Sequence, residues 1–424
     1  MKSLKRAQPP LSIIEAGSFP DVEKARLGNG IPVFIIEAGT EDILRLEFVF
    51  RAGQVKEYLP LLASTTNLML TEGSETYSAE KLNRELDFHG AFVNLSAEKD
   101  TASVVILCLA RHLGKILDLS GEILFRPVFP EKELNNLMKK RLRWFLNSRE
   151  KVTLLSLDQF FETIFGKNHP YGRQALAADF DLRSAELLRD FHSMHYTPDE
   201  MTIIVSGKIP GDTLKMMDRR FGNVERNYIY VEDPCSILKS SSERKVHIIK
   251  PEAVQTSVRI GSVTINKRHS DYFGLKIVDT ILGGYFGSRL MKNIREDKGL
   301  TYGIYSAVTS FDLAGYKLIS TEVSPLNVRR TIDEIYREIS LIQTEPVKET
   351  EMDVVRNYMS GELIRMFDGP FALAESFKSI WDFGLGVEYF SKFAEKIRKI
   401  TPEEIMSLAR IYYNIDEMYE ITAG

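Results

Sequence analysis

The sequence repeats itself over a long interval. Residues 184–207 align with residues 401–424 at an offset of 217 positions, and seven of the 24 aligned positions are identical. The identical pairs are Glu186/Glu403, Tyr196/Tyr413, Asp199/Asp416, Glu200/Glu417, Met201/Met418, Ile204/Ile421 and Gly207/Gly424. Self-similarity of this kind is typical of a duplicated structural unit. The chain of 424 residues is therefore predicted to fold as two homologous halves of about 200 residues each.

Each copy of the repeat predicts a helix, a turn and a strand. In the second copy Thr401 is a suitable N-cap, Pro402 suits the first helical position, and Glu404 completes a capping box. A weaker repeat lies upstream, where strand-like runs precede a helical segment in each half. The expected strands are residues 33–36, 44–50, 201–206 and 418–423, with a strand pair over 246–264, and the expected upstream helices are residues 59–70 and 271–282. Runs of strands together with helices favour an α+β fold over a doubly wound sheet.

The repeat also predicts the domain boundaries. We expect an N-terminal extension over residues 1–24, a first domain over 25–221, a linker over 222–244 and a second domain over 245–424. The linker contains the turn dipeptide Asp233-Pro234 and a polar run that ends at Glu243. Each domain should be an antiparallel-rich mixed β-sheet packed with helices. A chain with duplicated halves often binds its ligand between them.

Composition excludes several classes of function. The 55 Lys and Arg against 59 Asp and Glu give a net charge of −4, so no basic excess points to a nucleic acid or an anionic membrane. The longest apolar run, near residues 102–110, is about half of the roughly 20 residues that a transmembrane helix needs. No signal peptide is recognised, so the expected compartment is the cytoplasm, or the periplasm if the N-terminus has been trimmed. Two cysteines, Cys108 and Cys235, cannot form a disulfide framework and are expected to be free thiols.

The most specific motif lies in the second half, where Arg295-Glu-Asp-Lys-Gly-Leu-Thr-Tyr302 follows a glycine-rich turn. Arg295 and Tyr302 could donate hydrogen bonds from a guanidinium and a phenol to one carbonyl or oxyanion. The alternative is purely structural: an arginine at a helix C-terminus and a half-buried tyrosine in a strand. Spacing alone favours the structural interpretation.

With these residues the sequence resembles the pitrilysin/insulinase family of zinc peptidases, and within it the short-chain branch that includes the mitochondrial processing peptidase. In that family an Arg-x(3)-Gly-Leu-x-Tyr motif of the second domain holds the substrate carbonyl, and Arg295 and Tyr302 match it. The segments that begin at Phe88, His169 and Tyr196 resemble further family motifs, so the likeness covers about residues 25–424. The resemblance implies that the two domains form one half of a clamshell.

The sequence departs from the family at the zinc site. Active members carry His-x-x-Glu-His on a helix of the first domain, in which two histidines bind zinc and the glutamate activates water. The aligned positions here are Ser64, Asn67 and Leu68, so both histidines and the glutamate are absent. The family's distal glutamate should follow about 70–80 residues later, yet residues 135–148 hold no acidic residue. We therefore expect no metal in this chain.

Other candidate sites are weaker. His192 and His195 lie three apart on an expected helix, but no third ligand accompanies them at metal-binding spacing, and packing is the simpler interpretation. The basic cluster at residues 139–143 most simply forms a solvated helix face. No Gly-x-Ser-x-Gly and no evident Cys–His pair supports nucleophilic catalysis.

The resemblance implies a peptidase subunit that is inactive alone. A homologous partner would carry the zinc, while Arg295 and Tyr302 hold the carbonyl of a peptide substrate, and the peptide would lie along a strand near Phe92, Asn94 and Leu95. The alternative is a non-catalytic scaffold or a peptide-binding homodimer of the same fold. The Arg/Tyr pair favours the peptidase subunit. A zinc peptidase that is active by itself has no plausible ligand set here.

Overall fold

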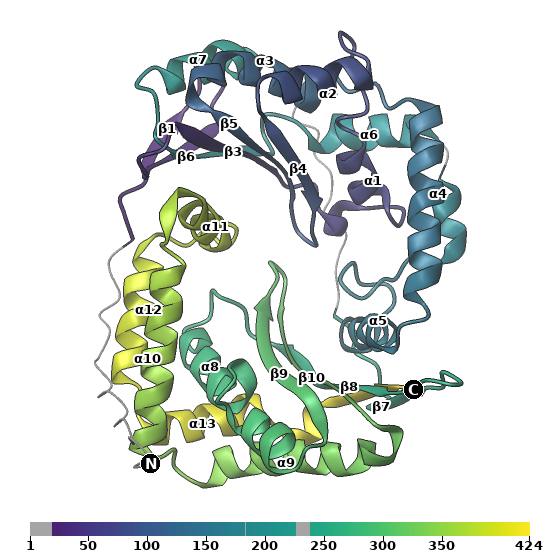
Figure 1. The fold of residues 1–424 in the computed structure, drawn as a ribbon, viewed down its shortest axis with the longest axis vertical. Helices are drawn as coiled ribbons and strands as arrows, with labels where there is room; N and C mark the ends of the chain where they lie inside the picture. The colour runs from purple at the N-terminus through teal and green to yellow at the C-terminus, as the bar shows by residue number, and fades with distance from the viewer. Residues whose placement is uncertain (1–18, 183, 226–237) are drawn as a thin grey trace, which may run out of the picture.

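The computed structural model describes residues 19–182, 184–225 and 238–424 (Figure 1). Most of the expected N-terminal extension and of the expected linker lies outside these residues, as does Cys235. The described chain forms two halves, each with one β-sheet and its own helices (Figure 1). This architecture confirms the predicted α+β fold with two homologous domains.

The first sheet has six strands in the order β1-β2-β6-β3-β5-β4. Its strands are β1 (Glu23–Arg26), β2 (Pro32–Glu37), β3 (Ile43–Phe50), β4 (Phe92–Ala97), β5 (Ala102–Leu109) and β6 (Met201–Gly207). Strands β2 and β6 pair in parallel, and every other neighbouring pair is antiparallel. β4 pairs only with β5 and therefore forms one edge of the sheet.

The second sheet repeats this plan with five strands in the order β7-β11-β8-β10-β9. Its strands are β7 (Lys245–Ile248), β8 (Thr256–Thr264), β9 (Thr301–Ser310), β10 (Gly315–Val323) and β11 (Tyr419–Ala423). The parallel pair is again made by the last strand of the half, here β11 with β7. β9 forms the edge that corresponds to β4. The predicted duplication is thus present in the strand order.

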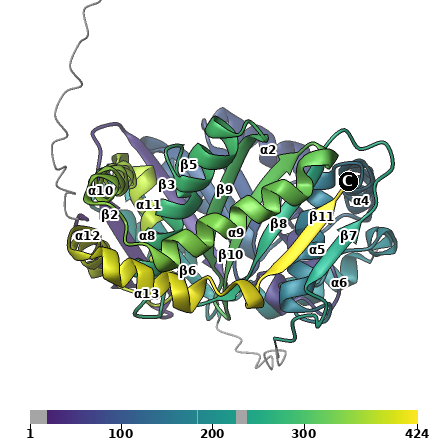
Figure 2. The same ribbon diagram turned by 90° about the horizontal axis from the view of Figure 1, so that it is seen from below.

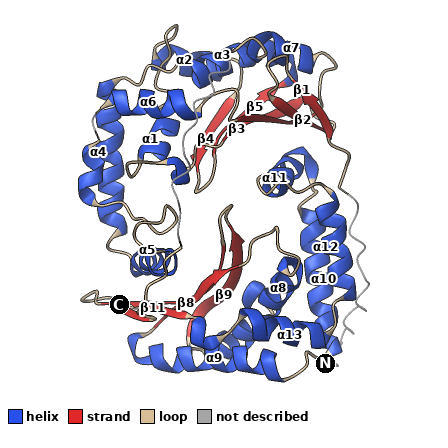
Figure 3. Cartoon of the chain, turned by 180° about the vertical axis from the view of Figure 1, so that it is seen from behind, coloured by secondary structure: helices blue, strands red, loops and turns tan. Residues whose placement is uncertain are grey.

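Helices cover the outer faces of both sheets. α2, α3 and α7 lie outside the first sheet, while α8, α9 and α13 lie outside the second (Figures 1, 2 and 3). The helices are α1 (Leu62–Leu68), α2 (Ala79–Phe88), α3 (Leu113–Phe125), α4 (Glu131–Ser148), α5 (Val152–Phe165), α6 (Ala185–His195), α7 (Thr213–Phe221), α8 (Tyr272–Asp279), α9 (Val328–Thr344), α10 (Glu349–Arg365), α11 (Gly369–Trp381), α12 (Glu388–Lys399) and α13 (Pro402–Tyr412). No helix among the described residues is long and apolar enough to cross a membrane.

Two expected helices differ from the prediction in length. α1 begins only after Leu61, whose φ of 69° lies in the left-handed region and interrupts the helical pattern. α8 ends at Asp279, and a π-helical turn over residues 280–284 follows it.

The N-cap of α13 is as predicted, because the Thr401 side chain accepts a hydrogen bond from the Glu404 amide. The Glu404 carboxylate pairs instead with Lys396, so the expected capping box is not completed.

One helix of each half packs on the sheet of the other half (Figure 1). α5 belongs to the first half but lies against β8 and β11, where Ser156 Oγ donates to Ser257 Oγ at 2.9 Å. α11 belongs to the second half but lies against β2 and β6, with the rings of Phe34 and Phe377 4.9 Å apart. α5 and α11 correspond to each other at the repeat offset of 217. This reciprocal exchange joins the halves through apolar contacts that each half cannot make alone.

Candidate functional site

Helix α1 carries the three positions that the resemblance assigns to the zinc motif. Ser64 is half-buried, Asn67 is fully buried, and Leu68 is partly exposed. Asn67 Nδ2 donates to the carbonyl of Ser103 at 3.4 Å and to the hydroxyl of Tyr196 at 3.2 Å, so its amide serves the core of the first half. A serine hydroxyl, a buried amide and an isobutyl group include none of the ligands that zinc takes from proteins.

The guanidinium of Arg141, on α4, contacts the start of this motif region on α1. Its Nη2 donates to Ser64 Oγ at 2.8 Å, and its Nη1 donates to Thr65 Oγ1 at 2.6 Å. The solvated face that we expected for residues 139–143 is therefore wrong for Arg141, because the turn of α4 directs this side chain toward α1. Burial lowers the pKa of the Arg141 guanidinium. Zinc does not fit here, since none of these side chains is a zinc ligand and the guanidinium that hydrogen-bonds to Ser64 would repel a metal cation.

Glu57 is a buried carboxyl group at the N-terminus of α1, which the sequence analysis missed. One oxygen accepts a hydrogen bond from the Ala63 amide at 2.8 Å, and the other lies 3.4 Å from Arg173 Nη2. Burial raises the pKa of Glu57 to about 7 despite these partners. Among the described residues, no three His, Cys, Asp or Glu side chains form a group that could hold a metal ion.

His192 and His195 have packing roles, as the simpler interpretation of their spacing held. His192 Nε2 lies 2.8 Å from the carbonyl oxygen of Leu124, and its ring stacks on Tyr196. Burial lowers the pKa of His192 to about 4, so the imidazole is neutral at physiological pH. The ring of His195 packs against Phe191.

Tyr302 and Arg295 lie on neighbouring elements of the second half. Tyr302 is the second residue of β9 and is 91 % exposed, and it lines a cavity of about 460 Å³ together with Arg259, Tyr305 and other residues of the second sheet. Arg295 lies in the π-helical segment 291–297, and its guanidinium lies 4.4 Å from the centroid of the Phe286 ring. Within the described chain neither side chain makes a hydrogen bond or an ion pair. The exposure of Tyr302 does not match the half-buried tyrosine of the structural alternative.

The expected peptide-binding residues lie on the edge strand β4, where they face two directions. Phe92 is 66 % exposed and Asn94 is exposed, whereas Leu95 is half-buried and packs against the core of the first half. In the described sheet the backbone of β4 pairs on one side only. Its other side therefore presents amide and carbonyl groups to which an extended peptide could add as a further strand.

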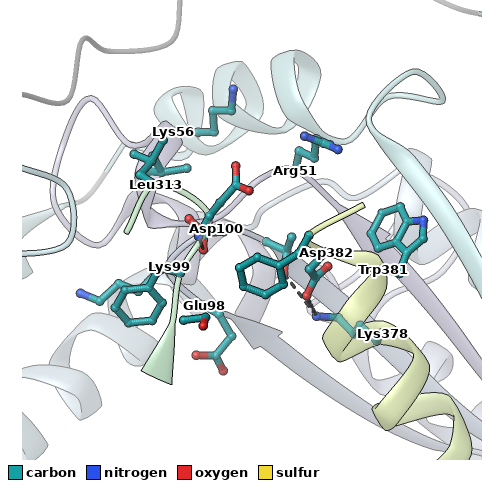
Figure 4. A pocket seen from close by; sticks show the side chains of 15 residues that line it. Arg51, Lys56, Glu98, Lys99, Asp100, Leu313, Lys378, Trp381 and Asp382 are labelled. Atoms are coloured by element: carbon teal, nitrogen blue, oxygen red, sulfur yellow. Dashed lines mark hydrogen bonds and ion pairs between the residues drawn. The ribbon is translucent and has the colours of Figure 1, made fainter. Parts of the chain in front are cut away.

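The two halves also meet at the turns that follow β4 and β9. Asp100 accepts a hydrogen bond from the Asp312 amide at 2.8 Å and another from the Tyr171 hydroxyl, which in turn accepts from the Leu313 amide at 3.1 Å. A cavity of about 310 Å³ lies beside this junction (Figure 4), and within it Lys378 Nζ donates to Asp382 at 3.0 Å. Burial raises the pKa of Asp100.

Comparison with known protein families and curated proteins supports the resemblance. Residues 184–359 match the family described as the peptidase M16 inactive domain. The Bacillus subtilis protein named uncharacterized zinc protease YmxG is 24 % identical over 301 residues, which are 70 % of this chain and 72 % of that protein. An uncharacterized zinc protease of Mycobacterium tuberculosis is 25 % identical over 352 residues, covering 81 % of this chain and 79 % of its own.

The fold matches solved structures over nearly its whole length. A peptidase M16 inactive domain from Pseudomonas fluorescens superposes with a TM-score of 0.88 at 22 % identity and covers 96 % of this chain and 98 % of its own. A protease from Helicobacter pylori gives a TM-score of 0.86 at 16 % identity, over 96 % of this chain and 100 % of its own. By these matches residues 184–359 resemble the peptidase M16 inactive domain, and the whole chain shares the fold of solved M16 structures and is similar to proteins named zinc proteases, without the His-x-x-Glu-His motif.

Proposed function

We propose that this chain is the non-zinc-binding subunit of a heteromeric M16 metallopeptidase. A homologous partner carries the zinc motif, and this chain supplies Arg295 and Tyr302 to the substrate carbonyl. A guanidinium and a phenol donating to one oxygen would stabilise the negative charge that develops there during hydrolysis. The chain alone hydrolyses no peptide, because the hydroxyl, amide and isobutyl groups at Ser64, Asn67 and Leu68 cannot activate water.

The exposure of Tyr302 carries this proposal. Tyrosine is on average a partly buried residue, yet Tyr302 is 91 % exposed at the edge of the second sheet. The neighbouring Phe286 is 62 % exposed and offers its ring to Arg295, which orders the guanidinium without consuming its hydrogen-bond donors. Both groups are thus available to a ligand from outside the chain.

The free edge of β4 supports a peptide as that ligand. A segment that pairs with Phe92–Ala97 must be extended, so it must come from an unfolded chain or a flexible loop. Phe92 and Asn94 would contact alternate side chains of such a segment, while Leu95 holds the strand to the core.

Reconstitution tests the proposal. The chain is expected to capture from its native extract, at one copy per chain, a homologue that carries His-x-x-Glu-His. The pair should cleave an unfolded fluorogenic peptide that neither chain cleaves alone. Cleavage by this chain alone, with one tightly bound zinc, would overturn the proposal. Capture of copies of this chain only would support the scaffold alternative.

A further inference from the structure

The guanidinium of Arg141 is a largely buried cation whose partners are neutral. Its two hydrogen bonds go to the hydroxyl groups of Ser64 and Thr65, and among the described residues it forms no ion pair. A guanidinium removed from water is costly unless an anion compensates its charge. The Glu57 carboxyl group acts on Arg141 from beyond ion-pair distance, and the burial of Glu57 favours its protonated, neutral form. The cation therefore lacks an anion within the described chain.

Arg141 lines a cavity of about 460 Å³ between α4, α1 and α5. The cavity wall is mostly apolar, and Leu68, Phe145 and Trp144 are among its residues. It also contains Lys140, which forms no ion pair in the described chain, whereas Arg149 is paired with Asp158 at 3.5 Å. The cavity thus places two cations without ion-pair partners beside an apolar wall. A ligand that carries a carboxylate next to an apolar side chain would match both features.

We propose that this cavity binds the C-terminal carboxylate of a peptide whose last residue is large and apolar. The carboxylate accepts hydrogen bonds from the Arg141 guanidinium, which has five donors and uses two of them on hydroxyl groups. Lys140 adds a second positive charge at the exposed side of the cavity. The terminal side chain lies against Leu68 and Trp144. This site acts without a partner subunit, so its test is independent of the proposed peptidase function.

Trp144 reports on binding directly, because it is 68 % exposed and lines the cavity. The chain has one other tryptophan, Trp381, and the variant Trp381→Phe leaves Trp144 as the single tryptophan, which is excited selectively over the tyrosines at the red edge of the absorption band. The probe is N-acetyl-leucyl-leucine, titrated into the purified full chain as the free acid and as the C-terminal amide. We expect the acid to change the Trp144 emission in a saturable way and the amide to bind at least tenfold more weakly, since a hydrogen-bonded charge pair is lost.

Variants on α4 separate the carboxylate site from a general charge effect. Arg141→Gln should weaken binding of the acid at least tenfold, whereas Arg143→Gln, which removes the same charge from an exposed position on the same helix, should leave it unchanged. Circular dichroism confirms that both variants are folded. Equal affinity for acid and amide, or equal behaviour of the two variants, would overturn the proposal. Tighter binding of N-acetyl-leucyl-glutamate amide than of N-acetyl-leucyl-leucine would also overturn the proposal, because it would show that the site binds acidic side chains and not a C-terminal carboxylate.

Discussion

Asn67 donates a 3.2 Å hydrogen bond from its amide nitrogen to the hydroxyl of Tyr196. The second half contains the corresponding contact, in which the hydroxyl of Tyr413 donates to Asp279 at 2.9 Å. Tyr196 and Tyr413 are equivalent positions of the sequence repeat. Each half thus ties the tyrosine that follows its late helix to a buried polar residue of its early helix. Asn67, the position that the resemblance aligns with the family's catalytic glutamate, is buried in the core of the first half.

The two contacts differ in direction, because Tyr196 accepts from an amide whereas Tyr413 donates to a carboxyl group, and this difference predicts unequal stabilities. Tyr413→Phe leaves a buried carboxyl group with one donor fewer, whereas Tyr196→Phe removes a bond between neutral groups. We expect Tyr413→Phe to lower the free energy of unfolding by about 1.5–3 kcal/mol and Tyr196→Phe by about 0.5–1.5 kcal/mol. Urea denaturation of both variants measures the difference. Equal losses would show that the two contacts are not energetically distinct.

The Arg/Tyr pair predicts a loss of turnover in the reconstituted complex. Arg295→Ala and Tyr302→Phe should each reduce kcat by about 10²–10³-fold if both groups donate to the developing oxyanion. Tyr305→Phe is the matched control, because Tyr305 lies on the same strand, lines the same cavity and is 55 % exposed. Full activity of both variants would remove the catalytic role. A higher KM with an unchanged kcat would assign the pair to ground-state binding.

Glu57 predicts a pH dependence of stability. Burial raises the pKa of Glu57 from 4.5 to about 7, so the native state holds a proton that the unfolded state releases between these values. The contribution of Glu57 to the free energy of unfolding should therefore fall as pH rises from about 4.5 to 7.

The variant Glu57→Gln isolates this effect. It cannot ionise, so its free energy of unfolding relative to the parent should rise by about 1–3 kcal/mol between pH 5 and pH 8. Denaturant unfolding at both pH values provides the measurement. A difference between parent and variant that is constant with pH would contradict the raised pKa.

Arg141 predicts how a zinc site could be rebuilt. Its guanidinium contacts Ser64, and it lines one cavity with Leu68, so residues 64, 68 and 141 converge. We expect the double variant Ser64→His/Leu68→His to bind zinc weakly, because a cation occupies the third position. Adding Arg141→Glu supplies three protein ligands and should tighten zinc binding at least tenfold. Competition with a chromophoric chelator measures the affinities, and equal affinities in the two variants would refute this convergence.

The sequence alone predicted the duplication, the α+β class and the absence of the zinc motif. These features are local: a repeat, a periodicity and a missing residue triplet can each be read without knowing which segments meet. The cap at Thr401 was predictable for the same reason, since it depends on residues three positions apart.

Only the tertiary structure determined which side chains meet. The basic run on α4 predicted a solvated face, yet α1 packs beside α4 and receives Arg141 at Ser64. No local pattern singles out Glu57, which folding places in a buried position at the N-terminus of α1, where its pKa is raised. The exchange of α5 and α11 between the halves likewise depends on contacts between residues more than 100 positions apart. The burial of a side chain and the groups that it contacts depend on many residues that are distant in the sequence. The charge states and exposures of the site residues are therefore set only when the chain folds.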